Sequence, residues 1–306
     1  MDRMNIYTTC YNNMMVFESW FILAVASAVF SGLFTFSQKI GTQMGFNSSQ
    51  VTRWILFGQL LSSLIYFYWF DYNWVQWEYV LWMGIVVGIL YAMIHWLRAL
   101  SLEYIDTAIY FPLNKFLGPL LVAIIGIVIV GDSLEGWDYL GIVLGAMVPL
   151  MLLDRLESGR QKNLSKGLQI MLLATLISAG AIFAARATAI SDGSIGWFVI
   201  IQSIFGILFL YANEWLFHKE KPARVRGKRL WQLIALGTIG GSMTGLSIFT
   251  ILNAFEIGFV SVIYTINSFY ILIPIVLSVW LYNEHMNLRK ALAIGFSIVA
   301  VIFFQI

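Results

Sequence analysis

The sequence is poor in charge and in the residues that build metal sites and disulfides. Only 11% of its 306 residues are charged, against about 25% in a soluble domain. The single cysteine, Cys10, excludes an internal disulfide, and the three histidines lie far apart in the chain. A net charge of +2 is too small to indicate a nucleic-acid partner. We therefore expect no cofactor, no metal ion and no nucleic acid.

The chain also lacks the short motifs of common enzymes and of ATP-driven pumps. Its sequence contains no G-x-x-x-x-G-K-[ST], no H-E-x-x-H and no G-x-S-x-G, and its carboxylates do not cluster. The segment GSMTG (241–245) superficially suggests a serine site but lacks the required spacing. These absences argue against an enzyme and against direct use of ATP.

Long apolar runs dominate the chain instead. It is 60% hydrophobic, with a mean hydropathy of +0.81, and a helix needs about 20 apolar residues to cross the roughly 30 Å hydrocarbon layer. The runs show no alternation of polar and apolar residues, which favours helices over a β-barrel. The sequence predicts an all-α integral membrane protein that has the lipid bilayer as its solvent. The ten predicted transmembrane helices are 16–38, 52–70, 79–100, 107–130, 137–153, 168–190, 196–217, 230–252, 258–282 and 289–305.

Basic residues gather in alternate loops. With the loops between spans numbered one to nine, 15 of the 18 Lys and Arg residues lie in or beside the odd loops, while the even loops are acidic. An excess of Lys and Arg marks the cytoplasmic side of a membrane. We therefore expect a multi-pass protein of the plasma membrane with both termini outside the cytoplasm. No cleavable signal peptide is expected, because the first apolar run is too long for one.

The two halves of the chain repeat. GIVVG (84–88) and GTIGG (237–241) are 153 residues apart, as are Asn114 and Asn267. Each unit has five spans, and two directly joined units with an odd number of spans must have opposite orientations. Inverted repeats are typical of secondary transporters, whose binding site lies near the midplane between the units. The predicted parts are a polar N-terminal tail (1–15), a first five-helix repeat (16–154), a basic linker (155–167) and a second five-helix repeat (168–306).

Stretches of both halves resemble one known family. The first half contains RALSLEYIDTAIYF (98–111), Pro119 and VGDSLEGWDYLG (130–141), and the second contains NAFEIGFVSVIY (253–264) and YNEHMNLRKALAIG (282–295). Together they resemble the repeat of the EamA type in the drug/metabolite transporter superfamily, and the resemblance extends over all ten spans. It implies two EamA-like five-helix units and transport as the activity.

The chain departs from the family pattern at three points. Asp132 stands where the family usually has Glu, and Ala293 stands where its Gly would fall; neither departure threatens the fold. Members of the family are commonly described with both termini in the cytoplasm. The basic loops of this chain predict the opposite orientation, which we retain as the expectation.

A lysine interrupts the fourth predicted span. Lys115 lies eight residues after the start of the span, or about 12 Å along the helix. A charge near the bilayer centre costs at least about 2.5–3.5 kcal/mol, and such residues usually face the interior or a water-filled cavity. We expect Lys115 to hold an anionic substrate or to carry a proton. The alternative is a structural lysine held by a carboxylate or by carbonyls that Pro112 and Pro119 leave unpaired.

Five further residues are candidates for a substrate site with Lys115. Asn114 and Asn267 either face each other across a central cavity or form helix–helix hydrogen bonds, worth about 0.6 kcal/mol in membranes. Tyr110 and Tyr264 either line that cavity or pack. His95 either relays protons or is a hydrogen-bonded interior histidine.

Three more basic residues end predicted spans. We expect Arg98 to lie at the cytoplasmic interface, and Lys39 and Arg186 either to gate or to anchor at an interface. The two GxxxG segments, 84–88 and 237–241, are expected to be packing faces, because small residues let helices approach closely.

The sequence thus predicts a secondary transporter of a small polar or amphipathic metabolite, such as an amino acid. One unit would rock against the other, with a coupling proton or a counter-substrate as the energy source. The alternatives are a sugar-phosphate or nucleotide-sugar exchanger of the same superfamily and a non-transporting membrane scaffold. Lys115 and Pro119 match the spacing of the sugar-phosphate translocators, but the ninth span lacks the basic residue that those proteins pair with this lysine.

Overall fold

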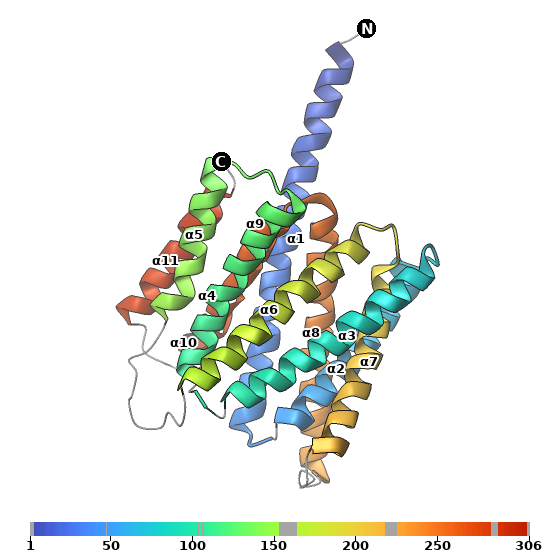
Figure 1. Cartoon of the computed structure of the whole chain (residues 1–306), viewed down its shortest axis with the longest axis vertical. Helices are drawn as coiled ribbons and strands as arrows, with labels where there is room; N and C mark the ends of the chain where they lie inside the picture. The colour runs from blue at the N-terminus through green and yellow to red at the C-terminus, as the bar shows by residue number, and fades with distance from the viewer. Residues whose placement is uncertain are drawn as a thin grey trace.

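The chain is helical throughout its described parts (Figure 1). The computed structural model describes residues 3–46, 48–102, 104–105, 107–152, 164–217, 225–282 and 287–304. The elements are α1 (Arg3–Gln43), α2 (Ser48–Phe70), α3 (Trp77–Leu102), α4 (Thr107–Ile125), the π-helical turn η1 (Gly126–Val130), α5 (Gly136–Met151), α6 (Leu164–Ala189), α7 (Ile195–Phe217), α8 (Lys228–Ile257), α9 (Val260–Ser268), the 3₁₀ turn η2 (Phe269–Ile271), α10 (Leu272–Tyr282) and α11 (Leu288–Phe303).

Seven helical segments of the described chain are long and apolar enough to cross a membrane. They lie in α1, α3, α4 with η1, α6, α7, α8, and the continuous stretch from α9 to α10. Helices α5 and α11 have 16 residues each, which corresponds to about 24 Å and is shorter than the hydrocarbon layer. The all-helical class is confirmed, and ten membrane crossings remain a prediction.

The helices run alternately up and down, so that α1 begins and α11 ends at the same end of the bundle (Figure 1). The helix ends that carry Lys39, Lys166 and Lys228 gather at the opposite end. The acidic residues Asp132 and Asp192 lie in connections at the first end. The charge asymmetry read from the sequence is therefore an asymmetry between the two ends of the folded bundle.

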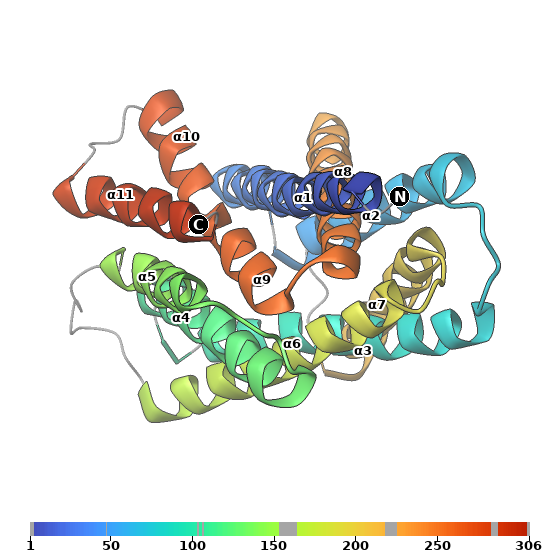
Figure 2. The ribbon, with the colours of Figure 1, turned by 90° about the horizontal axis from the view of Figure 1, so that it is seen from above.

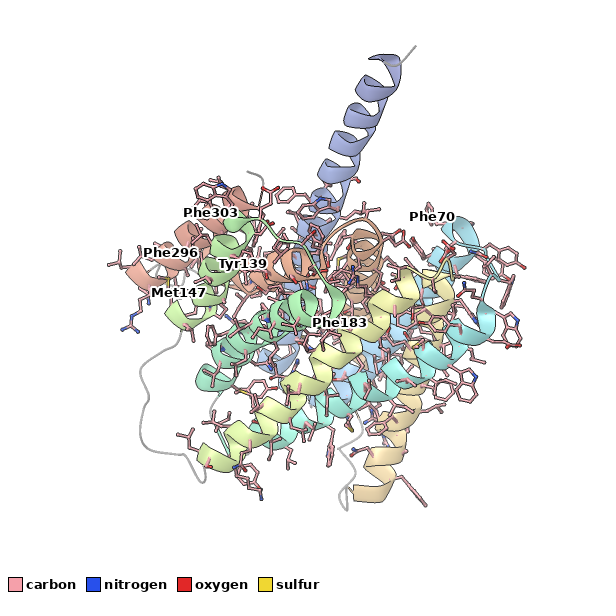
Figure 3. All side chains as sticks on the ribbon, turned by 45° about the horizontal axis from the view of Figure 1, so that its top comes forward. Phe70, Tyr139, Met147, Phe183, Phe296 and Phe303 are labelled. Atoms are coloured by element: carbon pink, nitrogen blue, oxygen red, sulfur yellow. The ribbon has the colours of Figure 1, made fainter. Side chains whose placement is uncertain are left out.

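Seen from above, the helices form two flanks (Figure 2). Helices α1, α2 and α8 pack together in one flank, and α3, α6 and α7 pack together in the other. Helices α5 and α11 pair at one end of the molecule, where the Trp137 ring stacks on Phe303 with centroids 5.5 Å apart. Figure 3 shows Tyr139 and Met147 of α5 on this pair, with Phe70 of α2 at the other end. Helices α4 and α9 pack on each other and connect the pair to the two flanks.

The predicted ninth span is broken by a short 3₁₀ turn. Proline has no N–H and its ring clashes with the carbonyl four residues earlier, so Pro274 cannot donate the helical hydrogen bond to the Tyr270 carbonyl. The chain tightens to η2 at this point before it continues as α10. A 3₁₀ stretch inside a longer helix is often a hinge.

Glycines bring helix backbones into direct contact on both flanks. A Cβ atom at Gly88 of α3 would lie 2.7 Å from the carbonyl oxygen of Gln202 on α7. At Gly241 of α8, a Cβ would collide with the carbonyl oxygen of Ile55 on α2. No side chain fits at either position without moving a backbone. The prediction that the two GxxxG segments are packing faces is confirmed.

The tight contact at Gly241 predicts a large effect of a single methyl group. We expect Gly241→Ala to lower the free energy of unfolding by about 1–3 kcal/mol, because overpacking must push α2 and α8 apart. Thermal unfolding of the purified protein in detergent measures the change. Gly295→Ala is the matched control, since nothing lies within 4 Å of a Cβ at Gly295 of α11. Equal unfolding midpoints for the two variants would contradict the proposed contact.

Candidate functional site

The ammonium group of Lys115 lies against an aromatic ring from the second half of the chain. Lys115 is half-buried on α4, and its Nζ is 4.6 Å from the centroid of the Tyr270 ring in η2. A cation over an aromatic face gains about 2 kcal/mol or more when water is excluded. The neighbour of this lysine is therefore an aromatic ring.

Both members of this contact precede a proline by four residues. Pro119 follows Lys115 in α4, and Pro274 follows Tyr270 at the start of α10. Each proline deprives the residue four positions earlier of its helical hydrogen-bond donor. The contact therefore joins two points at which the backbone carbonyl lacks its regular partner. The position of Lys115 before Pro119 was visible in the sequence, but the ring opposite was not.

Tyr264 of α9 faces the same side of α4. Its hydroxyl oxygen would lie 3.8 Å from a Cβ at Gly118, three residues and about one helical turn after Lys115. The hydroxyl also lies beside Ser178 of α6. Because Gly118 has no side chain, it leaves space for about one methyl group between α4 and the Tyr264 ring. Phe183, further along α6, lies where that helix passes α4 (Figure 3).

Arg98 is a second cation in this region. It lies beside the Tyr110 hydroxyl and is an electrostatic neighbour of Tyr91 and Tyr264. Its guanidinium Nε is buried and has no hydrogen-bond partner among the described residues. Sequence analysis placed Arg98 at the interface, because it ends the apolar run. The missed signal is the seven-residue spacing from Tyr91, which puts both on one face of α3.

The two tyrosines predicted for the site differ in their surroundings. Tyr110 keeps only 1% of its surface exposed and packs in a small cluster with Ile105 and Met171. Tyr264 is half-buried between α4 and α6. Tyr264 is therefore the better placed of the two to touch a bound solute, and the substrate role of both stays a prediction. The side chain of His95, on α3, lies outside the described residues.

Asn114 and Asn267 bond to neighbouring helices. The amide nitrogen of Asn114 donates to the Thr175 hydroxyl of α6 at 2.9 Å. The amide oxygen of Asn267 accepts from the Ser27 hydroxyl of α1 at 3.0 Å. Of the two alternatives left open by the sequence, the helix–helix hydrogen bond is the one that the structure contains. Contact of either amide with a substrate stays a prediction.

A small void lies between α2, α3 and α7. It measures about 10 Å³ and is lined by Gln59, Gln202 and Tyr91 among others. The amide oxygen of Gln202 is buried without a hydrogen-bond partner in the described structure. A void of this size holds about one water molecule, so it is too small for a metabolite.

Arg186 anchors the end of α6 to a buried carboxylate. Its Nη1 lies 3.7 Å from Oδ1 of Asp132, in the connection between α4 and α5. The other carboxylate oxygen of Asp132 accepts hydrogen bonds from the backbone N–H of Ser261, at 3.2 Å, and from its hydroxyl, at 2.7 Å. The carboxylate therefore also satisfies the start of α9, where unpaired N–H groups favour negative charge. These three residues fasten α4, α6 and α9 together at one end of the bundle.

Comparison with known families matches the second half of the chain, from α6 to α11. Residues 165–305 match the EamA-like transporter family. The predicted relation to the drug/metabolite transporter superfamily is confirmed by this match. With seven segments suited to crossing a membrane, and a second half that is similar to a family of transporters, the chain is a multi-pass membrane protein.

The comparison with solved structures gives information on the fold alone. Among the solved structures, 28 chains match this protein. One of them, described as "Crystal structure of protein", has a TM-score of 0.74 and 16% identity, over 94% of this chain and 96% of that chain. No curated protein matches the chain. At this identity the likeness extends to the arrangement of helices over nearly the whole length.

The Asp132 network predicts a large loss of stability when its carboxylate is removed. We expect Asp132→Ala to lower the free energy of unfolding by about 3 kcal/mol, because the Arg186 guanidinium and the start of α9 lose their shared partner. Thermal unfolding of Asp132→Ala, Arg186→Gln and the double variant forms a double-mutant cycle. The double variant should lose less than the sum of the single losses.

Asp192→Asn serves as the control for loss of one carboxylate. Asp192 is exposed at the same end of the bundle and has φ of +59°, a conformation that Asn tolerates. We expect its unfolding midpoint to match that of the unchanged protein. Strictly additive losses in the cycle would show that Asp132 and Arg186 do not interact.

Proposed function

We propose that the protein is a secondary active transporter of a small polar or amphipathic metabolite, such as an amino acid. The observation that carries the proposal is the Lys115–Tyr270 contact. It puts a positive charge of the first half against the second half of a chain from a transporter family. Charged residues inside membrane segments commonly mark a solute or ion pathway. Transport would use alternating access between two inverted units of five transmembrane helices, residues 16–154 and 168–306.

The pattern of helix contacts supports the inverted repeat. Helix α1 packs on α8 and α9, and its counterpart α6 packs on α3 and α4. Likewise α2 packs on α8, and its counterpart α7 packs on α3. The contacts of α2 with α7 and of α4 with α9 join counterparts directly. Exchanging the two units returns each of these contacts, whereas the contact of α4 with α5 has no equally close counterpart in the second unit.

The hydrogen bonds of the two asparagines are also related by exchange of the two units. Asn114 of the fourth helix of the first unit bonds to Thr175 of α6, which begins the second unit. Asn267 of α9 bonds to Ser27 of α1 in the first unit. Each fourth helix thus holds the first helix of the other unit through an amide and a hydroxyl. In an alternating-access mechanism these bonds would couple the two units near their centre.

A sugar-phosphate type of exchanger is the second candidate. Sequence analysis counted against it because the ninth span offers no basic residue to join Lys115. The structure has Arg98 of α3 beside the same group of tyrosines. A phosphate group would therefore meet two cations, which favours this candidate more than the sequence did. No observation of comparable kind favours a non-transporting scaffold.

The single native cysteine offers a test of the proposed orientation in the plasma membrane. Cys10 precedes the first predicted span. With both termini outside, a membrane-impermeant maleimide should label Cys10 on intact cells, and Cys10→Ser should remain unlabelled. In a Cys10→Ser, Ser165→Cys variant, the new thiol lies at the exposed opposite end of the bundle. It should react only after the cells are permeabilised; the reverse result would put the termini in the cytoplasm.

Transport itself is tested with the purified protein in liposomes. The solutes are amino acids, carboxylates, sugar phosphates, nucleosides and organic cations, each supplied as a radiolabelled tracer to liposomes preloaded with the same solute. We expect accumulation of at least one solute, reduced at least tenfold in Lys115→Met while the unfolding midpoint stays within a few degrees. Lys228→Met removes an exposed charge at the start of α8 and should transport normally. Full transport by Lys115→Met would remove Lys115 from the pathway.

A further inference from the structure

Two cations border one group of tyrosines. Lys115 lies on the Tyr270 ring, and Tyr270 is in turn an electrostatic neighbour of Tyr91, Tyr110 and Tyr264. Arg98 is a neighbour of the same three tyrosines. The cations come from α4 and α3 of the first half, and the rings come from both halves. Lys115 and Arg98 therefore act on one shared region between the halves.

Neither cation has a counter-charge in the described part of the chain. The ion pair found there joins Arg186 to Asp132, and no carboxylate of the described residues lies within salt-bridge distance of Arg98 or Lys115. The Arg98 Nε also lacks an acceptor. Charges removed from water without a partner are costly. A bound anion would supply what is missing, because carboxylate and phosphate oxygens accept hydrogen bonds from both kinds of donor.

The surroundings of the cations suit an apolar, flat body beside the anionic group. At Gly118, one turn from Lys115, α4 has no side chain between its backbone and the Tyr264 ring, which leaves space for about one methyl group. Tyr91 keeps 38% of its surface accessible. Rings of this kind pack on an aromatic solute in stacked or edge-on geometry. The tyrosines thus offer contacts for the part of a solute that the cations do not hold.

From these contacts we propose that the transported solute is an anion with an aromatic body. Arg98 and Lys115 hold its carboxylate or phosphate, and the tyrosines contact its ring. This inference rests on the proposed transport function and names the substrate class of the same site. It gives a partner to two cations that have no carboxylate beside them among the described residues.

The test uses four probes that share a benzene ring and differ in the attached group. Phenylacetate and phenyl phosphate are anions, phenylacetamide is neutral, and phenethylamine is a cation. Thermal unfolding of the full-length protein in detergent reports binding, because a ligand of the native state raises the unfolding midpoint. We expect a concentration-dependent rise with at least one anion and none with phenylacetamide or phenethylamine. A response to phenylacetate alone identifies a carboxylate site, and a response to phenyl phosphate alone identifies a phosphate site.

Variants separate recognition of charge from a structural role. Arg98→Gln and Lys115→Gln should each weaken binding of the anion at least tenfold, and Lys115→Arg should restore most of it. Lys228→Gln removes a charge far from the tyrosines and should bind normally. Glu103→Gln and Asp106→Asn, which alter the acids that follow Arg98 in the sequence, should keep the preference for anions. If either abolishes anion binding as Arg98→Gln does, Arg98 serves a protein carboxylate and the inference fails.

Transport measurements distinguish failure of this inference from failure of the proposed function. The same four probes are followed in liposomes together with the wider solute panel. Uptake of phenethylamine, or of neutral solutes in preference to anions, overturns the anionic substrate class and leaves the transporter standing. No uptake of any solute above protein-free liposomes overturns both. Uptake of an anion that requires both Arg98 and Lys115 supports both.

Discussion

Contact between helix backbones is the constraint on which the rest of this structure depends. In lipid, association of helices gains little from the hydrophobic effect and relies on close packing. On one flank Gly241 of α8 touches the backbone of α2, and on the other Gly88 of α3 touches the backbone of α7. Both contacts join the first half of the sequence to the second. The halves are therefore interlocked side by side, and the tyrosines and cations lie between helices fixed by these contacts.

Charge inside the bundle is treated in two different ways. At one end, Asp132 is enclosed by Arg186 and by the start of α9, so both of its carboxylate oxygens have a partner, although the Arg186 Nε has none in the described structure. Between the halves, Lys115 rests on a ring and the Nε of Arg98 is buried without an acceptor in the described structure. In the first arrangement the two opposite charges lie against each other, and removing one of them would destabilise the fold. The second remains open to a partner, as expected of residues that act on a solute.

The sequence predicted the helices well, because long apolar runs and the need to satisfy backbone groups in lipid leave few alternatives. The depth of Lys115 and the packing role of the GxxxG segments followed from simple counting along a helix. Contacts between segments distant in the sequence could not be predicted by such counting. The ring under Lys115 lies 155 residues away in the chain, and the bond of Asn267 to Ser27 depends on where α1 passes α9. The position of Arg98 at the membrane interface stays a prediction, and its neighbours Tyr91, Tyr110 and Tyr264 could not be read from the end of an apolar run.

The 3₁₀ turn between α9 and α10 has a mechanical consequence. Tyr270 belongs to the turn itself, so its ring direction follows the backbone torsions of only three residues, Phe269–Ile271. Pro274 keeps that turn from closing into a regular helix. Because a 3₁₀ stretch inside a longer helix is often a hinge, a rotation at this turn would change the position of the Tyr270 ring relative to α4. The ring that contacts the Lys115 ammonium is therefore carried by the irregular turn of its helix and not by a regular helical segment.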